Sequence, residues 1–445
     1  MHDGLTQIRA WSHVALEGVW ALGMTLLIGA LRGLNLLESW AEAWPQGLRG
    51  AGSWLTAQAR PALALGVLAG LGVIGVSLVS KPPPGAPQSA KAAAPIAATA
   101  RPATPARAQP PRAPLGPPPV ALQARLDELA ESYRESVGIA VADCSEGWMA
   151  QVAGEDAFPQ QSVSKLWVAM TALDAHDQGK LSLDQGVVLG PQDRSVFFQP
   201  ISHKIGTTGY ATTLRDLVRR ALIDSDNAAN DKLLQQVGGV DAVADMLARK
   251  NLSGIRMGAD EKNLQSKIAG LTWSPELGIG GAFKDARSRL PDAVRDAAMA
   301  AYIKDPLDGA TPAGLAQALM LLQRGELLSP QSTDTFLATM AEARTGPRRL
   351  KGGLPPGWAI AHKTGTGQDW RGGSIGINDV AVLTAPDGRA YAVVVLMKRT
   401  TKPVAARLAF MQQVSKAVVS TWERERHNDR QTLASLRSGE STTGR

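Results

Sequence analysis

Apolar positions recur at helical spacing at both ends of a region that begins near Val120. Four apolar residues repeat every three or four positions at its start: Leu122, Leu126, Leu129 and Tyr133. Five show the same period near its end: Val404, Leu408, Met411, Val414 and Val418. Each pattern predicts a helix with one buried face. After Trp422 the sequence turns polar, so we expect the folded part to end near residue 425 and residues 426–445 to fray as a polar tail.

Shorter apolar runs beside these two helices are typical of β-strands. The runs 137–141 and 148–152 predict a strand pair at the N-terminal end. The runs 380–383 and 390–397 predict a hairpin, because the intervening Ala-Pro-Asp-Gly (385–388) favours a turn. Strands at both ends with helices between them indicate an α+β fold, in which the two ends of the region complete one antiparallel sheet and the middle forms a helical lobe.

Two apolar runs precede this region. Residues 61–80 carry no charge and lie between Arg60 and Lys81. About twenty apolar residues suffice to cross a bilayer, so this run is a candidate transmembrane helix. A cleaved signal peptide is the alternative, but the run lies far from Met1. The run 18–31 is shorter, and both an interfacial helix and a short transmembrane helix remain open for it.

Basic residues set the expected orientation of this N-terminal part. If residues 18–31 span the membrane, Arg32, Arg49 and Arg60 mark the loop between the two runs as cytoplasmic. Either topology then places the C-terminal part outside the inner (cytoplasmic) membrane. We therefore expect a membrane-anchored protein whose folded domain is periplasmic.

The stretch from residue 81 to residue 119 is dominated by Pro and Ala and has no apolar period. Such a composition predicts an extended, unpacked tether, which as polyproline would reach roughly 100 Å. It is either a spacer toward the cell wall or a plain disordered linker. The expected organisation is an anchoring region (1–80), a linker (81–119), a folded domain (120–425) and a polar tail (426–445).

Composition narrows the possible partners. The 445 residues carry a formal net charge of +7, and the Lys and Arg residues are scattered without a basic block, so nucleic acid is not an expected partner. Cys144 is the only cysteine, which excludes an internal disulfide and a cysteine-based metal site. The six His residues show no metal-binding spacing. We expect neither a metal nor another cofactor.

Ser162 and Lys165 are the first candidate catalytic residues along the chain. The pair opens an apolar-periodic run, and a spacing of three places both side chains on one face of a helix's first turn. A serine hydroxyl becomes a good nucleophile when a neighbour takes its proton, and a half-buried lysine at a helix start can help. Alone, this spacing is also compatible with an ordinary amphipathic helix.

Two further motifs follow in order, Ser225-Asp226-Asn227 and Lys363-Thr364-Gly365-Thr366-Gly367. With Ser162-x-x-Lys165 they form the set carried by class A β-lactamases and penicillin-binding proteins, which this chain resembles over residues 120–422. Other stretches match class A landmarks: Phe158-Pro159, Gly238-Gly239, residues 325–328, residues 354–358 and Asn378-Asp379. The resemblance implies a β-lactamase/transpeptidase-like α+β fold with about five antiparallel strands, flanking helices and an all-helical lobe.

The resemblance also implies roles for the residues of these motifs. Ser162 would be acylated with help from Lys165, and Ser225 would pass a proton to the leaving nitrogen. Asn227 would hold the substrate's side-chain amide. The backbone N–H groups of Ser162 and Thr366 would form an oxyanion hole. The substrate carboxylate would bind in the Lys363-Thr364-Gly365-Thr366 stretch.

Two more positions match substrate-binding residues of the family. Arg349 occupies a place from which several class A enzymes present an arginine to the carboxylate, and a guanidinium suits bidentate pairing. A solvated arginine in a basic loop is the alternative. Phe198 matches an aromatic residue at the mouth of the cleft, although a purely structural phenylalanine is also compatible.

A carboxylate distinguishes hydrolysis from stable acylation. A class A β-lactamase uses a glutamate to activate water against the acyl-serine. Counting from Gly238-Gly239 brings Glu261 into register, in Glu-Lys-Asn-Leu-Gln, whereas the family pattern is Glu-x-x-Leu-Asn, so Gln265 is a departure. The segment that follows, up to Thr311-Pro312, is unusually long and contains a competing candidate, Glu276. We favour Glu261.

We therefore expect a serine hydrolase that opens β-lactam amide bonds through an acyl-serine intermediate. A D,D-peptidase acting on peptidoglycan stem peptides is the alternative, which the tether, the long segment and Gln265 would suit. A β-lactam sensor that stays acylated is the third interpretation. The expected partners are a small β-lactam or D-alanyl peptide, the membrane and peptidoglycan.

Overall fold

The computed structural model describes residues 116–440. The expected membrane segments at 18–31 and 61–80, nearly all of the linker and the last five residues lie outside this range. Within residues 116–440, every helix is too short or too polar to be a candidate membrane span.

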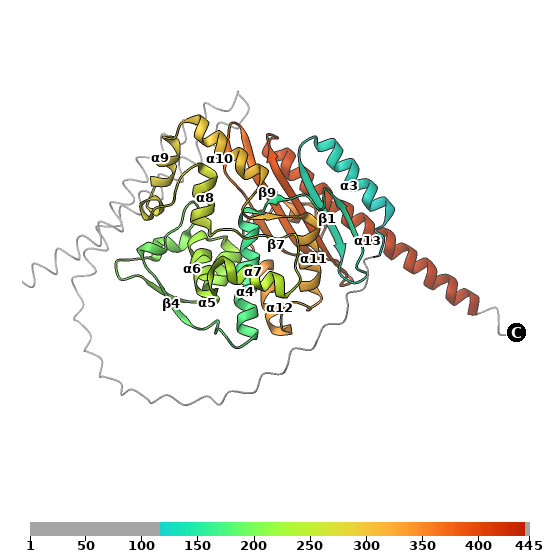
Figure 1. Cartoon of the computed structure of the whole chain (residues 1–445). Helices are drawn as coiled ribbons and strands as arrows, with labels where there is room; N and C mark the ends of the chain where they lie inside the picture. The colour runs from blue at the N-terminus through green and yellow to red at the C-terminus, as the bar shows by residue number, and fades with distance from the viewer. Residues whose placement is uncertain (1–115, 441–445) are drawn as a thin grey trace, which may run out of the picture. The chain divides into compact units, whose positions relative to one another are not determined.

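One antiparallel sheet forms the centre of the domain (Figure 1). Its strands follow the order β2-β1-β10-β9-β7, and a short strand, β8, also pairs with β9. Their bounds are β1 Val137–Asp143, β2 Met149–Val152, β7 Ala359–Gly365, β8 Asp369–Trp370, β9 Gly373–Thr384 and β10 Ala390–Thr400. Val137 lies opposite Met397, so strands from the two ends of the domain pair directly. The expected hairpin is β9–β10, and the α+β interpretation is confirmed.

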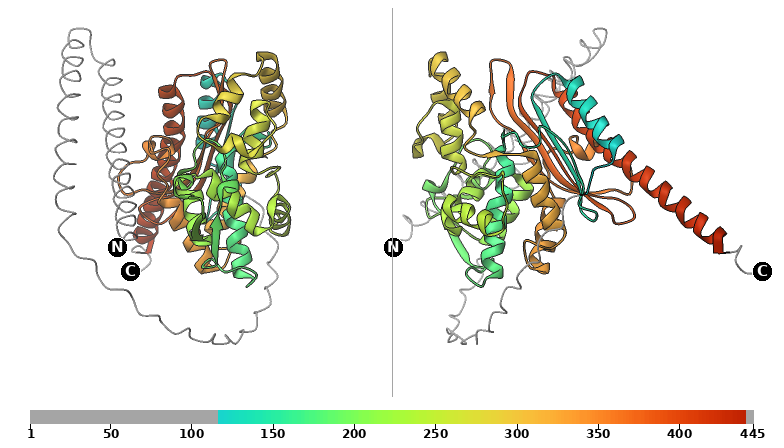
Figure 2. Two further views of the ribbon diagram at one scale, coloured as in Figure 1. Left: turned by 90° about the vertical axis from the view of Figure 1, so that its left-hand side faces the viewer. Right: turned by 45° about the vertical axis from the view of Figure 1, so that its right-hand side comes forward.

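The alternation of side chains along β1 decides what covers each face of the sheet. Val137, Ile139 and Val141 point into an apolar cluster with α3 (Val120–Tyr133) and α13 (Val404–Glu440). Ala140 and Ala142 point the opposite way, into a larger cluster with the remaining helices. Figure 2 shows the sheet between these two layers. The buried positions of α3 are the four apolar residues expected from its period.

The C-terminal helix is longer than the sequence pattern predicts. We expected the chain to fray after Trp422, but α13 continues to Glu440. The extension has a local cause, because residues 423–438 contain neither Gly nor Pro and include several Arg, Glu and Leu residues, which favour helix. Loss of an apolar face therefore does not end this helix.

The middle of the chain forms the helical lobe and the helices behind the sheet. Their bounds are α4 Lys165–Asp177, α5 Leu214–Arg219, α6 Asn227–Val237, α7 Gly239–Arg249, α8 Glu261–Ala269, α9 Ala282–Ser288, α10 Asp292–Lys304, α11 Pro312–Gln323 and α12 Pro330–Ala341. Two small antiparallel pairs accompany them: β3 (Phe158–Pro159) with β6 (Gly309–Ala310), and β4 (Gly186–Leu189) with β5 (Tyr210–Thr213).

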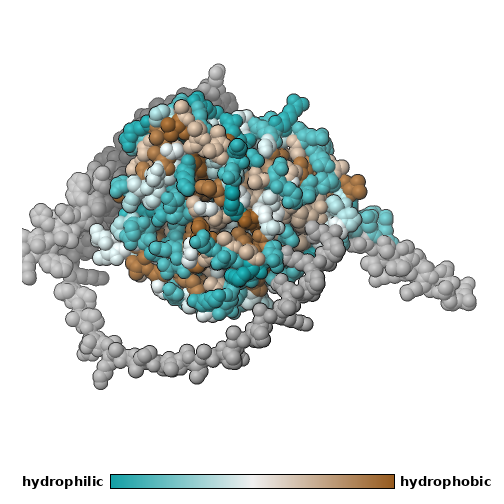
Figure 3. All heavy atoms as spheres, viewed as in Figure 1, coloured by the Kyte–Doolittle hydropathy of each residue, from teal (hydrophilic) through white to brown (hydrophobic). Residues whose placement is uncertain are grey.

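Helix α4 is the central element of the lobe. Every residue from Lys165 to Asp174 is buried, so this helix is covered on all sides, as the apolar run after Lys165 predicted. The outer surface differs: on the face shown in Figure 3, apolar residues are interspersed with polar ones. The start of α4 is thus held rigidly where the lobe meets the sheet, since the turn before it contacts β7 and β9.

Candidate active site

Ser162 lies in a tight 3₁₀ turn, Gln161–Ser164, that leads into α4. Gln161 has a positive φ of 53°, a conformation that side-chain-bearing residues adopt rarely and that is common at functional sites. Lys165 begins α4 and is fully buried. Its Nζ donates a hydrogen bond to Ser162 Oγ at 2.8 Å. The expected juxtaposition of hydroxyl and ammonium is present.

Ser225 is brought to the same place by an irregular helix end. One π-helical turn, Arg220–Asp224, precedes it, and Ser225 itself takes a left-handed conformation with φ 63°. Asp226 then caps α6 by accepting a hydrogen bond from the Ala229 N–H, which fixes Asn227 as the first residue of the helix. Asn227 Nδ2 donates to the Val196 carbonyl at 2.8 Å, and the residue lines the cavity.

Lys363 lies on the edge strand β7 and faces Ser225. Its Nζ donates to Ser225 Oγ at 2.9 Å and to the Thr364 carbonyl at 3.0 Å. Complete burial lowers the pKa of Lys363 well below the usual lysine range, and the nearby charge of Lys165 lowers it further. The ammonium is therefore poised to gain from any anion that enters the cavity.

The end of β7 must carry a glycine, Gly365, because the backbone of a neighbouring segment lies too close for a side chain. A Cβ atom at this position would lie 2.4 Å from the Gln160 carbonyl oxygen, which is shorter than any real contact. Asn378 Nδ2 on β9 binds the carbonyls of Pro159 and Gln160, at 2.7 and 3.0 Å. These contacts hold the turn carrying Ser162 against the sheet edge.

Arg349 reaches the same edge from the segment before β7. Its guanidinium donates to the carbonyls of Gly365 (2.8 Å) and Asn378 (2.6 Å) and to Thr366 Oγ1 (2.6 Å). These acceptors are neutral, and burial lowers the pKa of Arg349. These contacts hold the guanidinium in place beside Thr366, and its role toward a substrate carboxylate stays a prediction.

Glu261 is the first residue of α8, and its buried carboxylate pairs with Lys165 Nζ. The backbone N–H of Glu261 donates to Asp231 Oδ1 at 2.7 Å. Asp231 is itself buried, and desolvation, together with the nearby Asp260 and Glu261, raises its pKa to about 7. Glu276 differs: its side chain is exposed and hydrogen-bonded to Ser274, which lowers its pKa, and it does not line the cavity around Ser162.

A buried polar network that the sequence did not reveal supports the turn that carries Ser162. Gln161 donates through its backbone N–H to Asp308 Oδ2 (2.6 Å) and through Nε2 to the Tyr302 hydroxyl (2.6 Å). Tyr302 in turn donates to Asp308 Oδ1 at 2.8 Å. Gln265 Nε2 donates to Gln161 Oε1 at 2.8 Å. Burial raises the pKa of Asp308 to about 6. The departure at Gln265 therefore ties α8 to the residue before Ser162.

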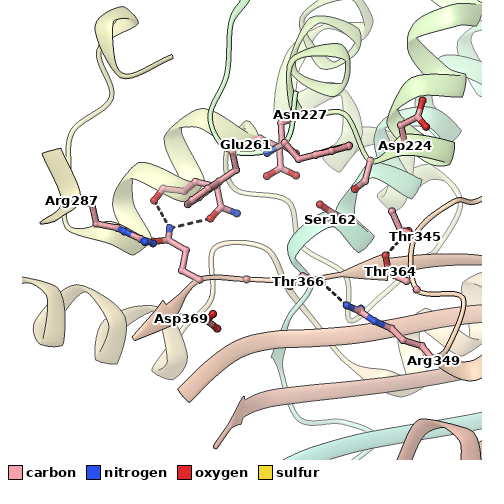
Figure 4. A pocket seen from close by; sticks show the side chains of 17 residues that line it. Ser162, Asp224, Asn227, Glu261, Arg287, Thr345, Arg349, Thr364, Thr366 and Asp369 are labelled. Atoms are coloured by element: carbon pink, nitrogen blue, oxygen red, sulfur yellow. Dashed lines mark hydrogen bonds between the residues drawn. The ribbon is translucent and has the colours of Figure 1, made fainter. Parts of the chain in front are cut away.

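These side chains surround a cavity of about 450 Å³ (Figure 4). Ser162, Ser225, Asn227, Glu261, Arg349, Thr364 and Thr366 line it. Thr345 Oγ1 and Thr364 Oγ1 lie 2.7 Å apart beside Arg349. Phe198 also lines the cavity and its side chain is 58% exposed, which fits the mouth rather than a structural core position. Lys165 and Lys363 lie directly behind the lining.

Other residues of the cavity carry no motif. Arg287 on α9 and Gln368 before β8 line it, yet they come from segments without a periodic or family pattern. Only the unusual length between Gln265 and Thr311 signals that extra structure, namely α9 and α10, lies beside the site. In the described part of the chain, no group of three or more His, Cys, Asp or Glu residues could hold a metal ion.

Comparison with known proteins agrees with this geometry. Residues 121–422 match the model of the β-lactamase enzyme family. β-Lactamase VEB-1 of Pseudomonas aeruginosa is 27% identical over 60% of this chain and 79% of its own length. The extended-spectrum β-lactamase PER-1 of the same species is 26% identical over 66% of this chain and 85% of its own length.

Solved structures give the same result. A β-lactamase from Chitinophaga pinensis, 27% identical, superposes with a TM-score of 0.54 over 67% of this chain and 98% of that one. An ancestral class A β-lactamase, 29% identical, gives 0.53 over 67% and 99%. The family match extends over more than half of the chain and contains every residue that lines the cavity. The chain therefore belongs to the β-lactamase enzyme family and is a homologue of the class A serine β-lactamases.

Proposed function

We propose that this protein hydrolyses β-lactams through an acyl intermediate on Ser162, with Lys165 and Glu261 as its proton-transfer pair. The observation that carries the proposal is the chain of contacts from Ser162 Oγ to Lys165 Nζ to the Glu261 carboxylate, which is buried beyond the hydroxyl. A single ammonium thus links the nucleophile to a carboxylate that can serve as a base.

In acylation, Ser162 Oγ attacks the β-lactam carbonyl carbon while the Lys165–Glu261 pair takes its proton. The oxyanion forms between the backbone N–H groups of Ser162 and Thr366. As the C–N bond breaks, Ser225 gives its hydroxyl proton to the leaving nitrogen, and the proton that the Lys165–Glu261 pair took from Ser162 then restores the Ser225 hydroxyl. Lys363 Nζ, 2.9 Å from Ser225 Oγ, supports this transfer electrostatically.

In deacylation, Glu261 takes a proton from a water molecule that attacks the ester carbon. The ester C–O bond breaks, and Ser162 Oγ regains a proton from the pair. The net reaction adds one water across the amide bond. Glu261 in contact with Lys165 favours this hydrolytic outcome over the D,D-peptidase and the sensor, since the β-lactam adduct of each of those persists on the serine.

The substrate carboxylate binds at the edge of β7. Thr364, Thr366 and Arg349 line this end of the cavity, and Lys363 lies behind it. Gly365 allows the edge to approach the nucleophile. Asn227 receives the side-chain amide, and Phe198 covers the entrance. Lys363 supplies a charge that a buried carboxylate would otherwise lack.

The placement of the enzyme follows from its N-terminal sequence. Residues 61–80, with or without 18–31, anchor the chain in the inner membrane, and residues 81–119 tether the domain in the periplasm. β-Lactams and peptidoglycan are both met on that side of the membrane.

Nitrocefin hydrolysis, measured beside covalent labelling by a fluorescent penicillin, tests the function. The wild-type protein should turn over nitrocefin, and Ser162→Ala should lose both turnover and labelling. Stable labelling without turnover would contradict the β-lactamase proposal and favour the sensor or the D,D-peptidase. Release of D-alanine from a pentapeptide would then identify the peptidase. Labelling that persists in Ser162→Ala would remove Ser162 as the nucleophile.

A further inference from the structure

The cavity around Ser162 has a second cationic end that the proposed reaction does not use. Arg349 lies at one end, beside Thr366, and Arg287 lies at the other (Figure 4). In this view the two guanidinium groups are on opposite sides of Ser162, with Glu261 and Asn227 between them. The reaction assigned above explains Arg349 and leaves Arg287 without a role.

Arg287 is held in position by neutral partners. Its Nη1 donates to Gln368 Oε1 at 2.8 Å, and its guanidinium carbon lies 5.8 Å from the centre of the Phe197 ring. Gln368 is fixed in turn, because its Nε2 donates to the carbonyl and to Oε1 of Gln265, at 2.8 and 3.1 Å. Phe197 stacks edge-on against Phe283, at 4.9 Å between centroids. The guanidinium is therefore pre-positioned before any ligand binds.

The charge of Arg287 is not neutralised by its neighbours. No carboxylate of residues 116–440 lies within ion-pairing distance of it, although Asp369 also lines the cavity. The Asp369 carboxylate instead accepts a hydrogen bond from Ser374 Oγ. Arg295 is a further cation near Arg287, and Arg371, which lies near Arg295, is already paired with Asp296 and Asp292. This end of the cavity therefore keeps an unpaired positive charge.

The direction of a bound substrate brings its side chain to this charge. Figure 4 shows Asn227 between Arg349 and Arg287. A substrate with its ring carboxylate at Arg349 and its side-chain amide at Asn227 would therefore direct the substituent beyond the amide toward Arg287. We propose that Arg287 is a specificity-determining residue that favours β-lactams whose acyl side chain carries a carboxylate. A planar guanidinium pairs with a carboxylate through two parallel hydrogen bonds, and Gln368 orients it for that contact. This inference rests on the proposed function.

Two penicillins that differ by one carboxylate test the proposal. Benzylpenicillin and its α-carboxyl derivative carbenicillin are compared by kcat/KM in the full-length protein. Arg287→Gln should lower the ratio of carbenicillin to benzylpenicillin about tenfold, a plausible size for one partly exposed charge pair. Arg287→Lys should keep part of the preference for carbenicillin, because lysine retains the positive charge but lacks the planar pair of N–H donors of the guanidinium. Added salt should lower the wild-type ratio and leave the ratio of Arg287→Gln unchanged.

Arg289→Gln is the matched control, since Arg289 is exposed, follows α9 directly and does not line the cavity. It should leave the ratio unchanged. A ratio that Arg287→Gln does not alter overturns the proposal, as does an equal loss on both substrates, which would mark a structural role. A wild-type protein that hydrolyses neither penicillin would instead remove the proposed function itself.

Discussion

At the scale of single residues, the site depends on buried charges that are hydrogen-bonded. Lys165 contacts both the Ser162 hydroxyl and the Glu261 carboxylate, and Lys363 contacts Ser225. Buried charges are costly unless partners compensate them, so each of these residues constrains the others. The competition between Glu261 and Glu276 shows how this matters, because only one of the two side chains reaches this set.

Replacing Glu261 by Gln should trap the acyl-enzyme. The amide cannot take a proton from water, so we expect kcat to fall about 10²–10⁴-fold while the adduct on Ser162 accumulates. Intact-mass measurement after mixing with benzylpenicillin would detect the adduct. Glu276→Gln is the matched control and should turn over normally. Trapping by Glu276→Gln instead would show that the exposed glutamate activates the water.

Deprotonation of Lys363 should lower the activity of the enzyme at alkaline pH. Its pKa is lowered by burial, so its charge is lost as the pH rises through a value below the ordinary lysine range, and carboxylate binding weakens there. Lys363→Arg keeps the charge to higher pH, and the alkaline limb of kcat/KM for benzylpenicillin should move upward. Lys351→Arg, at an exposed lysine outside the cavity, should not move it. If the alkaline limb of the pH profile does not move in Lys363→Arg, another group is responsible for it.

At the scale of elements, periodic segments were predictable and the parts that complete the site were not. The buried faces of α3 and α13 and the β9–β10 hairpin follow from apolar spacing and turn residues. The motifs located Ser162, Ser225 and Lys363, because local chemistry is visible in the sequence. Beyond the unusual length of its segment, α9 had no pattern that predicted it, and the Gln161–Tyr302–Asp308 network had none either, because such a network depends on polar contacts between distant segments.

Tyr302→Phe tests how firmly this network holds the nucleophile's turn. The mutation leaves Asp308 Oδ1 without its donor, and an unsatisfied buried acceptor costs about 1–3 kcal/mol, so Tm should fall by several degrees. Tyr210→Phe is the control, because the hydrogen bond that its hydroxyl accepts from Lys204, at 3.4 Å, lies near the surface. Equal Tm values for the two variants would contradict a supporting role.

The same network makes stability depend on pH. The pKa of Asp308 is raised from 3.8 to about 6, so between these values the native state binds more protons than the unfolded state. Its contribution to stability is therefore present at low pH and is lost as the pH rises toward 6. Because the Tyr302 hydroxyl stabilises the ionised form, the Tm deficit of Tyr302→Phe should be larger at about pH 8 than at about pH 5.

At the scale of the whole molecule, residues 120–425 contain the complete sheet, both apolar clusters and every cavity residue. The full chain should therefore sediment with membranes and require detergent, whereas a fragment of residues 116–440 should be soluble and retain kcat/KM within about twofold. Ultracentrifugation and nitrocefin assays check both. A full chain that stays in the supernatant without detergent would contradict the membrane anchor. A fragment that does not fold would contradict the independence of the domain.

The pairing of Val137 with Met397 has a consequence for biogenesis. The central strand β10 emerges near the end of synthesis, yet β1 needs it as a neighbour. Closing so long a loop is entropically costly and slow, so the nascent polypeptide stays open until nearly all of it has been made. The chain would therefore remain unfolded long enough to pass through an export channel that accepts only unfolded polypeptides. Folding of the domain would then be completed after translocation.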